Sequence, residues 1–404
     1  MDGSHGSCGS SRRRFLKVAA ATGAAATSIS AEVALAAPEE KLPTITLGKT
    51  GATVTRLGMG TSWTVQPVFV QTAIAQGVRY IDTAEGYESG NSEKTVGLVL
   101  ERTGKRKDVF LVTKNSGYRR AQGPGATKIF EERLNKSLER LRTDYVDAYY
   151  LHGLTGEQIP MLFDPGVKAA FEQLKKAGKI RFAGLSCHDK RLVEVVEAAA
   201  KCGWLDQIMI QYNYRTMDAD TLRRAIDLAS KANLGLVAMK TQGGAGSFRE
   251  IEPSPKFAQF REKGFNQFQA AIKAVLTDER IHLVVSEMTN RDQLRENMAA
   301  VREPLTSKEA RLLEEHRQKT AHLYCHGCGH LCETAAKGVP VATVLRYLRY
   351  YSVYGKRAEA RALYQALPPE ARDLATADLA AAEAACPYGL PVTQLVQIAD
   401  RKLG

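Results

Sequence analysis

Four side chains suited to acid–base chemistry lie at the ends of short apolar runs or just after them. Asp82 ends one run and Tyr87 follows in the next loop, while Lys114 and His152 end the next two runs. A tyrosine with an ordinary pKa of about 10 donates protons poorly at neutral pH unless a nearby positive charge stabilises its anion. Lys114 can supply that charge and Asp82 can keep the lysine protonated. A neutral His152 can then donate a hydrogen bond to a carbonyl oxygen, so the four residues predict a proton-delivery site for carbonyl reduction.

The elements that must position these residues alternate along the chain. Short, β-branched apolar runs alternate eight times with amphipathic stretches whose apolar residues recur every three or four positions. The expected strands are residues 55–60, 80–84, 109–114, 146–152, 180–186, 207–213, 235–240 and 282–288. Expected helices include residues 128–141, 167–176, 191–201, 220–232 and 265–277.

Eight strands, each followed by a helix, predict an α/β fold of the (β/α)8 TIM-barrel type. A doubly wound sheet is the main competitor, but no G-x-G-x-x-G follows the first strand. Residues 42–53, with a Gly48-Lys49-Thr50-Gly51 turn, predict a hairpin that closes the bottom of the barrel. In such barrels catalytic residues lie at the C-terminal ends of the strands, where the four polar residues are expected.

Several motifs in this region resemble the aldo/keto reductase family. Residues 81–87, which read IDTAEGY, and the following GNSE at 90–93 are similar to the family's signature around its aspartate and tyrosine. Val112-Thr113-Lys114 and Leu151-His152-Gly153 are similar to its lysine and histidine motifs. The resemblance covers residues 42–320. It implies hydride transfer between a nicotinamide cofactor and a carbonyl or alcohol, with Tyr87 as general acid or base.

The same resemblance implies a set of cofactor-binding residues. Positions matching those that hold nicotinamide, ribose and pyrophosphate in the family are Gly60, Thr61, Ser186, Gln211, Gly243 and Gly244. The segment 286–297 resembles the family's adenosine-phosphate loop, and its expected ligands are Ser286, Met288, Gln293, Glu296 and Asn297.

Two positions depart from the family's pattern. Cys187 stands where the family usually has asparagine, and Glu287 stands where it has glycine or a basic residue. A 2′-phosphate would meet an acid at Glu287, which favours NAD over NADP or indicates weak cofactor binding. Trp63, just past the first strand, either stacks on substrate or packs as an ordinary core residue.

Past residue 301 the alternation stops and cysteines appear. Cys325, Cys328 and Cys332 form a C-x2-C-x3-C pattern, and a distant Cys386 precedes proline. This arrangement resembles iron–sulfur ligation in ferredoxin-like domains and predicts one [4Fe–4S] cluster in a helical domain at residues 321–404. The intervening stretches 341–354 and 358–366 have helical patterns. Four thiolates could also hold zinc, or form disulfides in an exported chain, and both alternatives stay open.

The N-terminus carries a possible export address. Residues 11–17 read SRRRFLK, an alanine-rich stretch follows, and Ala34-Leu35-Ala36 offers a small-residue cleavage site. This order predicts that residues 1–36 are a twin-arginine signal peptide, read by the twin-arginine translocase, and that the folded protein is exported, for example to the periplasm. The stretch is too interrupted by polar residues for a membrane anchor, and no other span is expected.

The net charge of +12 does not indicate nucleic-acid binding, because basic residues are scattered among acidic ones. The leading hypothesis is an exported oxidoreductase that transfers hydride between a tightly bound nicotinamide and a sugar, polyol or aldehyde. Its cofactor would be loaded before export and recycled in place, with the cluster either structural or passing electrons to an external redox partner. The alternative is an exported iron–sulfur electron-transfer or binding protein on the same scaffold, with weak or no nicotinamide binding.

Overall fold

The structure is a computed structural model that describes residues 41–404 except 64–65, 246–263 and 265. Residues 41–404 form one compact unit. The predicted signal peptide at residues 1–36 lies outside the described residues, as does the first residue of the helix expected at 265–277.

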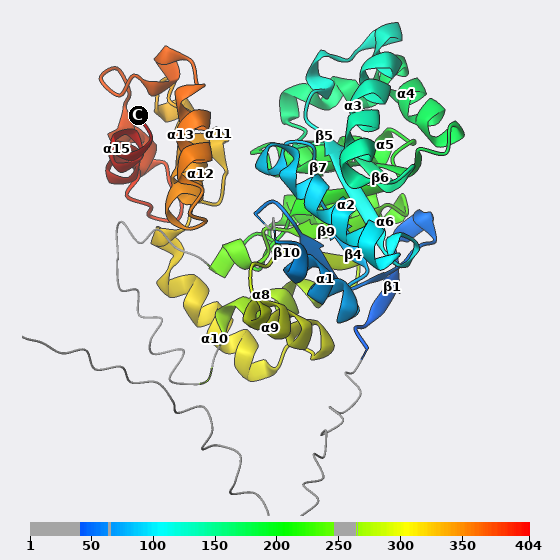
Figure 1. The fold of residues 1–404 in the computed structure, drawn as a ribbon. Coiled ribbons are helices and arrows are strands. Elements are labelled where there is room, and N and C mark those ends of the chain that lie inside the picture. The colour runs from blue at the N-terminus through cyan, green and yellow to red at the C-terminus, as the bar shows by residue number, and fades with distance from the viewer. Residues whose placement is uncertain (1–40, 64–65, 246–263, 265) are drawn as a thin grey trace, which may run out of the picture. The chain divides into compact units, whose positions relative to one another are not determined.

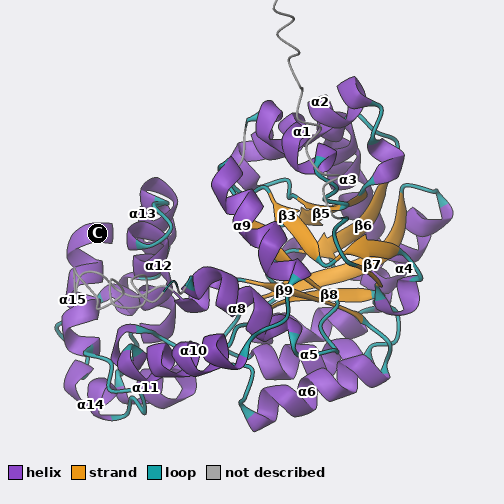
Figure 2. Ribbon diagram, turned by 90° about the horizontal axis from the view of Figure 1, so that it is seen from below, coloured by secondary structure: helices purple, strands orange, loops and turns teal. Residues whose placement is uncertain are grey.

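Eight parallel strands close into a barrel in the order β10-β3-β4-β5-β6-β7-β8-β9, which confirms the predicted TIM-barrel architecture (Figure 2). Closure is made where β10 pairs with β3, with Val284 opposite Leu57. The strands are β3 (Leu57–Gly60), β4 (Tyr80–Asp82), β5 (Phe110–Asn115), β6 (Val146–Leu151), β7 (Ile180–Cys187), β8 (Gln207–Gln211), β9 (Gly235–Met239) and β10 (Leu283–Glu287).

Helices surround this barrel on its outside (Figures 1 and 2). They are α1 (Pro67–Ala75), α2 (Asn91–Thr103), α3 (Ala126–Leu141), α4 (Pro165–Lys176), α5 (Leu192–Lys201), α6 (Asp220–Lys231), α8 (Gln267–Leu276) and α9 (Arg291–Arg302). Local sequence explains where they begin. In α4, for example, Asp164 accepts a hydrogen bond from the Val167 amide and Pro165 takes the first helical position.

The boundaries differ from the predicted ones by a few residues. The first barrel strand begins at Leu57 instead of residue 55, because Thr55 belongs to the hairpin strand β2. His152 and Lys240 lie one residue past β6 and β9, so both belong to the loops above the barrel. Short 3-10 helices occupy many of the loops, at Tyr87–Gly90, Arg106–Asp108, Tyr118–Arg120, Gly123–Gly125, Gly156–Phe163, Gln242–Ala245, Ala321–Leu323 and Pro369–Arg372.

The predicted hairpin is present as β1 (Thr44–Thr46) and β2 (Thr53–Thr55), joined through the 3-10 turn Gly48–Thr50. It covers the start of β9: the Lys49 amide donates to the Asn233 carbonyl at 2.7 Å. Leu47 is fully buried with residues that fill the barrel interior. The hairpin therefore closes the barrel bottom, as expected.

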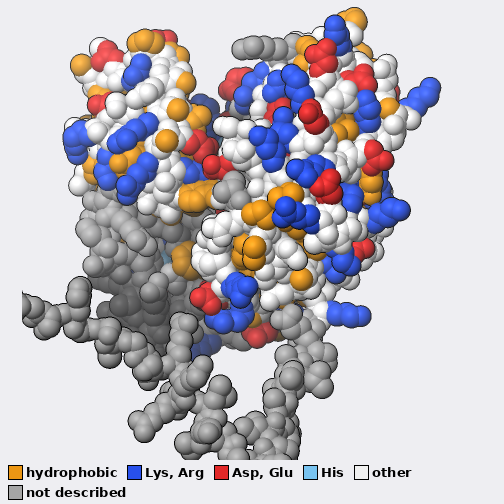
Figure 3. Space-filling view, in the orientation of Figure 1, with side chains coloured by type: hydrophobic (Ala, Val, Ile, Leu, Met, Phe, Trp, Pro, Cys, Tyr) orange, Lys and Arg blue, Asp and Glu red, His pale blue; other side chains and the backbone are white. Residues whose placement is uncertain are grey.

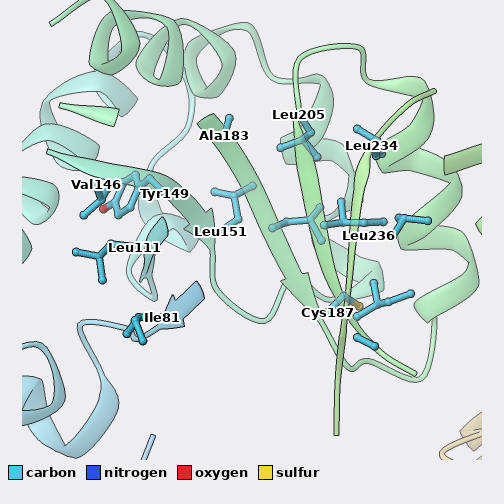
Figure 4. Close-up of a cluster of buried hydrophobic side chains, with 14 of the residues drawn as sticks. Ile81, Leu111, Val146, Tyr149, Leu151, Ala183, Cys187, Leu205, Leu234 and Leu236 are labelled. Atoms are coloured by element: carbon cyan, nitrogen blue, oxygen red, sulfur yellow. The ribbon is translucent and has the colours of Figure 1, made fainter. Parts of the chain in front are cut away.

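Apolar side chains form two layers on either side of the strands. Inside the barrel, the rings of Tyr80 and Phe110 stack with centroids 5.3 Å apart, and the hydroxyls of Tyr80 and Tyr150 lie 3.1 Å apart. Outside, a larger cluster joins the strands to the helices, and Figure 4 shows part of it, including Leu111 and Leu151. The alternation along each strand sends successive side chains into opposite layers.

The C-terminal region is helical, with a buried core of its own. Its helices are α10 (Ser307–Lys319), α11 (Gly329–Ala335), α12 (Val341–Ser352), α13 (Arg357–Gln365), α14 (Leu379–Ala384) and α15 (Val392–Leu403). The helical stretches expected at 341–354 and 358–366 correspond to α12 and α13. None of the helices among the described residues has both the length and the apolar character needed to cross a bilayer.

Side chains of both signs are mixed over the barrel face seen in Figure 3, where Lys and Arg lie beside Asp and Glu. This distribution agrees with the absence of a basic stripe from the sequence.

At Gly97, helix α2 packs directly against the backbone at the end of α3. A Cβ atom there would lie 2.5 Å from the Leu141 carbonyl carbon. We predict that Gly97→Ala lowers the free energy of unfolding by about 1–3 kcal/mol, although alanine favours helices. Chemical denaturation measures this change. Gly125→Ala is the matched control, because no atom lies within 4 Å of its added Cβ, and an equal loss in both variants would contradict the packing argument.

Candidate functional site

The structure brings the four predicted polar residues together above the barrel. Asp82 ends β4, Lys114 lies in β5, and His152 directly follows β6. The Lys114 ammonium lies 2.7 Å from each carboxylate oxygen of Asp82 and donates to the Tyr87 hydroxyl at 3.1 Å. The rings of Tyr87 and His152 meet edge to face with centroids 5.4 Å apart. All four line one cavity of about 780 Å³.

An unusual turn presents Tyr87 to this cavity. Tyr87 begins a 3-10 turn in which Glu88 and Ser89 have φ values of 47° and 54°, in the left-handed region. Two consecutive non-glycine residues in that region store strain, which is common at functional sites. Gly90 ends the turn with φ 87°, and a Cβ there would lie 3.0 Å from the Arg140 side chain. The loop conformation is therefore fixed by its surroundings and directs the phenol inward.

Burial dominates the electrostatics of the ion pair. Asp82 and Lys114 are only 3% and 1% exposed. Burial raises the pKa of Asp82, against the lowering effect of Lys114. It also lowers the pKa of Lys114, against the raising effect of Asp82. Each group thus stabilises the charged form of the other against burial, and removing one partner would leave the other buried without a counter-charge.

Tyr87 differs from the sequence-based expectation. Burial, and then the charges of Asp82 and Glu287, raise its pKa well above the usual 10. Burial is the largest cause and the charge of Asp82 the next, so together they outweigh the stabilisation of the anion that was expected from Lys114. The phenol is therefore protonated at neutral pH, which is the state needed to donate a proton, but its raised pKa makes it a weaker acid than a free tyrosine.

His152 is held neutral. Burial, followed by the charges of Lys114 and Arg119, lowers its pKa well below 6.5. Its Nδ1 lies 2.9 Å from the Ser116 hydroxyl. If that hydroxyl donates to Nδ1, the Nε2 proton remains for a hydrogen bond to a carbonyl oxygen.

Most of the predicted cofactor residues line the same cavity: Gly60, Ser186, Gly243, Ser286, Gln293, Glu296 and Asn297. Others lie elsewhere. Thr61 is buried and its hydroxyl donates to the Asp82 carbonyl, Met288 is fully buried in the core, and Gln211 lines a second cavity. Gly244 lies in the 3-10 helix Gln242–Ala245.

A polar network joins three of the elements around this cavity. Ser286 at the end of β10 donates to Gln242 at 2.5 Å and accepts from the Asn297 amide at 2.9 Å. Gln242 in turn donates to Asn297 at 2.8 Å. This closed set fixes the glycine-containing loop after β9 against α9. Glycines beside hydrogen-bonding side chains can hold a dinucleotide's phosphates and ribose, so these residues fit the cofactor that the sequence predicts.

Glu287 has a role that the sequence did not indicate. Its carboxylate accepts from the amides of Ser62 and Trp63, each at 2.9 Å, and from the Ser62 hydroxyl at 2.8 Å. Burial raises its pKa in spite of these bonds. The acid thus holds the loop after β3 in place, a tertiary contact that local sequence cannot reveal.

The C-terminal region contributes residues that the sequence assigned to a separate domain. The catalytic cavity is also lined by Tyr350, Ser352, Val353, Tyr354, Lys356 and Glu359. The Lys356 ammonium lies 5.2 Å from the Trp63 ring centre, so Trp63 lines the cavity beneath a cation. A Cβ at Gly243 would lie 2.4 Å from the Tyr354 hydroxyl. The end of α12 and the start of α13 thus complete the cavity wall, which we call the helical wall.

The four C-terminal cysteines border one small cavity of about 20 Å³. None of the six described cysteines is in a disulfide. Burial raises the pKa of Cys325 to about 11 and that of Cys332 to about 12. Over the described part of the chain, no group of three or more His, Cys, Asp or Glu side chains is arranged to hold a metal ion. The thiols are neighbours, but they do not form a ready-made metal site.

Comparison with known proteins gives a consistent result. The pattern of the aldo/keto reductase family matches residues 64–318, more than half of the chain. The chain is 27% identical to L-galactose dehydrogenase of Arabidopsis thaliana, over 64% of this chain and 87% of that protein. It is also 27% identical to the NADH-specific methylglyoxal reductase of Escherichia coli, over 67% and 97%. The holo form of aldo-keto reductase AKR11C1 from Bacillus halodurans matches with TM-score 0.55 and 25% identity, covering 71% and 99%.

The buried imidazole gives a prediction that needs no substrate. In protein with 15N-labelled histidine, the His152 ring should stay neutral as the pH falls from about 8 to about 5, because its pKa is depressed. Lys114→Met removes the second largest cause of that depression and should raise the pKa part of the way toward 6.5. Lys168→Met, which removes an exposed lysine on α4, should leave it unchanged. A His152 that protonates near pH 6.5 in the unaltered protein would refute the electrostatic description.

Proposed function

Because the chain belongs to the aldo/keto reductase family and is therefore an oxidoreductase, we propose that it interconverts a small carbonyl compound and its alcohol, with Tyr87 as general acid or base. The substrate is a sugar, polyol or aldehyde, and the cofactor is NAD or NADP. Glu296 places an acid along the cavity, which favours NAD, whereas the carboxylate of Glu287 is already occupied by the loop after β3. The bound nicotinamide supplies or accepts the hydride.

One observation carries this proposal: the Tyr87 hydroxyl lies 3.1 Å from an ammonium that is itself held by a buried carboxylate, inside a large cavity. In the reduction direction, the protonated Tyr87 gives its proton to the substrate oxygen. Lys114 orients the phenol and stabilises the charge left on it. His152 donates a second hydrogen bond to the same oxygen, which favours the developing negative charge.

We propose further that the cofactor is carried with the protein. The twin-arginine pattern at residues 1–36 motivates export in the folded state, to a compartment that does not supply free nicotinamide. The helical wall supports retention, because Tyr354 packs on Gly243 and Lys356 lies over Trp63. Contacts of a dinucleotide with both the barrel loops and the helical wall would slow its dissociation.

The C-terminal cysteines are proposed to hold one [4Fe–4S] cluster. A [4Fe–4S] cluster is bound by four cysteine thiolates, and this region offers four free cysteines that border one cavity: Cys325, Cys328, Cys332 and Cys386. Burial raises the pKa of Cys325, Cys328 and Cys332, so binding of iron by these thiols would release protons. The thiols are not spaced as metal ligands before loading, and we infer that they rearrange around the inserted cluster. The cluster is either structural or the route to an external redox partner.

Tyr87→Phe tests the proposed chemistry. It should slow carbonyl reduction by about 10²–10⁴-fold, because it removes the proton donor without removing the ring. Both the unaltered protein and this variant, purified from the native compartment and then denatured, should release NAD or NADP. Mass spectrometry of the released ligands detects the cofactor. Tyr351→Phe, a half-buried tyrosine on α12 that does not line the cavity, is the control and should retain activity. Protein that holds no dinucleotide and has no affinity for it would refute the proposal.

A separate measurement tests the cluster. Protein purified without oxygen should be brown, absorb at about 400 nm and contain iron and acid-labile sulfide. Cys328→Ser should lose this absorbance, while Cys202→Ser, which alters a half-buried cysteine of the barrel, should keep it. Colourless protein containing zinc, or equal spectra in both variants, would show that the cysteines serve another purpose.

A further inference from the structure

A second cavity of about 260 Å³ adjoins the catalytic one. The two share part of their lining, namely His188, Lys240, Gly243, Tyr350 and Tyr354. The second cavity extends from the ends of β7 and β9 toward the cysteine-bearing segment. A molecule whose carbonyl lies beside Tyr87 can therefore place its other end there.

The charged residues of this second cavity are mainly basic: Lys190, Arg215, Lys240, Arg346 and Arg349 line it, and Asp189 is its acid. Asp189 is engaged, because its carboxylate accepts from the amides of Gly156 and Arg191 at 3.1 and 3.0 Å. Lys190 is also paired, with Glu333 at 2.6 Å. These contacts leave an excess of positive charge in the cavity.

Lys240 and Arg346 lie at the side of this cavity nearer the barrel, where each contacts a residue shared with the catalytic cavity. No salt bridge joins either to a carboxylate within the described residues. The Lys240 ammonium reaches the Tyr350 hydroxyl at 3.3 Å and lies 4.8 Å from the centre of that ring. One Arg346 nitrogen donates to the His188 carbonyl at 3.3 Å, while its buried Nε has no hydrogen-bond partner. Buried charges and donors are costly without partners, so a ligand anion would satisfy both.

The backbone conformation of Lys240 is unusual and fixes where this lysine lies. Its φ is 57°, in the left-handed region that side-chain-bearing residues rarely adopt. The strained backbone places this lysine at the junction of the two cavities, beyond the end of β9. Its charge also reaches the catalytic end, because after burial it is the largest cause that lowers the pKa of His188, and it contributes to the same shift in His152.

The other two arginines belong to the cysteine end. Arg349 lies 4.1 Å from the Tyr324 ring centre and donates to the Cys325 carbonyl at 3.5 Å. Arg215 lies 4.9 Å from the same ring and donates to the Arg317 carbonyl at 3.2 Å. These contacts place Arg215 and Arg349 beside Tyr324 and the cysteine-bearing segment. Lys240, in contrast, also lines the catalytic cavity, and Arg346 contacts His188, which lines both cavities.

We propose that the substrate carries an oxyanion, a carboxylate or a phosphate, which Lys240 and Arg346 bind in the second cavity while the carbonyl lies at Tyr87 and His152. This inference rests on the proposed function of that site. In the reduction, hydride adds to the carbonyl carbon and the Tyr87 proton to its oxygen, while the anionic group is unchanged. Two cations on one oxyanion make charge-assisted hydrogen bonds, which are the strong ones.

Matched substrate pairs test the proposal in full-length, cofactor-loaded protein. The pairs are succinic semialdehyde with 4-hydroxybutanal, D-glucuronate with D-glucose, and D-glyceraldehyde 3-phosphate with D-glyceraldehyde. At least one anion should have a KM about ten-fold lower than its neutral partner. Arg346→Met should raise the KM of that anion about ten-fold, with little change in kcat or in the KM of the neutral partner. The phosphate pair distinguishes the two kinds of oxyanion.

Arg346 is the decisive position, because it lines the second cavity but not the catalytic one, so its variant should retain the cofactor. Lys168→Met controls for the loss of one positive charge. Calorimetry with the same anions distinguishes the anion site from the proposed hydride transfer. If an anion binds, Arg346→Met abolishes its binding and the protein does not turn it over, the anion site is supported and hydride transfer is refuted. If no pair favours its anion and no anion binds, or if Arg346→Met weakens anionic and neutral substrates equally, the proposal is overturned.

Discussion

The buried ion pair between Lys114 and Asp82 is the constraint on which the rest of the site depends. The two groups are almost fully removed from water, and at 2.7 Å each stabilises the charged form of the other against the cost of burial. The pair also joins adjacent strands, β4 and β5, at the end where the barrel opens. Tyr87 receives its hydrogen bond from this lysine, and the charge of Lys114 helps to keep His152 neutral. The barrel thus supplies what free side chains in water lack, a fixed separation in a dry environment.

The features that could be predicted from the sequence are those that follow from the repeated spacing of apolar residues. The eight strands follow from alternating apolar runs, and the polar residues that end them must meet because parallel strands of a barrel end on one face. The closing hairpin follows from its glycine turn. Boundaries shifted by a few residues, as at Thr55, because pairing with a neighbouring strand and not local preference decides where a strand begins.

Features that depend on contacts distant in sequence could not be predicted. The direction of the Tyr87 pKa shift depends on burial and on the charge of Asp82, and neither effect is visible in a motif. The position of Glu287 in a loop motif led to the expectation that it faces the cofactor's 2′-position. In the structure, its carboxylate accepts hydrogen bonds from the amides of Ser62 and Trp63, in the loop after the neighbouring strand β3. The helical wall was missed because residues 350–359 have no local pattern typical of a binding site. Their role comes only from packing against the barrel.

The contact between Gly243 and Tyr354 limits how this architecture can vary. A side chain at position 243 would collide with a residue that belongs to a different part of the chain. A side chain larger than glycine in the barrel loop would therefore require the Tyr354 side chain of the helical region to move. In a chimera of this protein, the residue at position 243 and the residue at position 354 would therefore have to be chosen together, although more than a hundred residues separate them in the sequence.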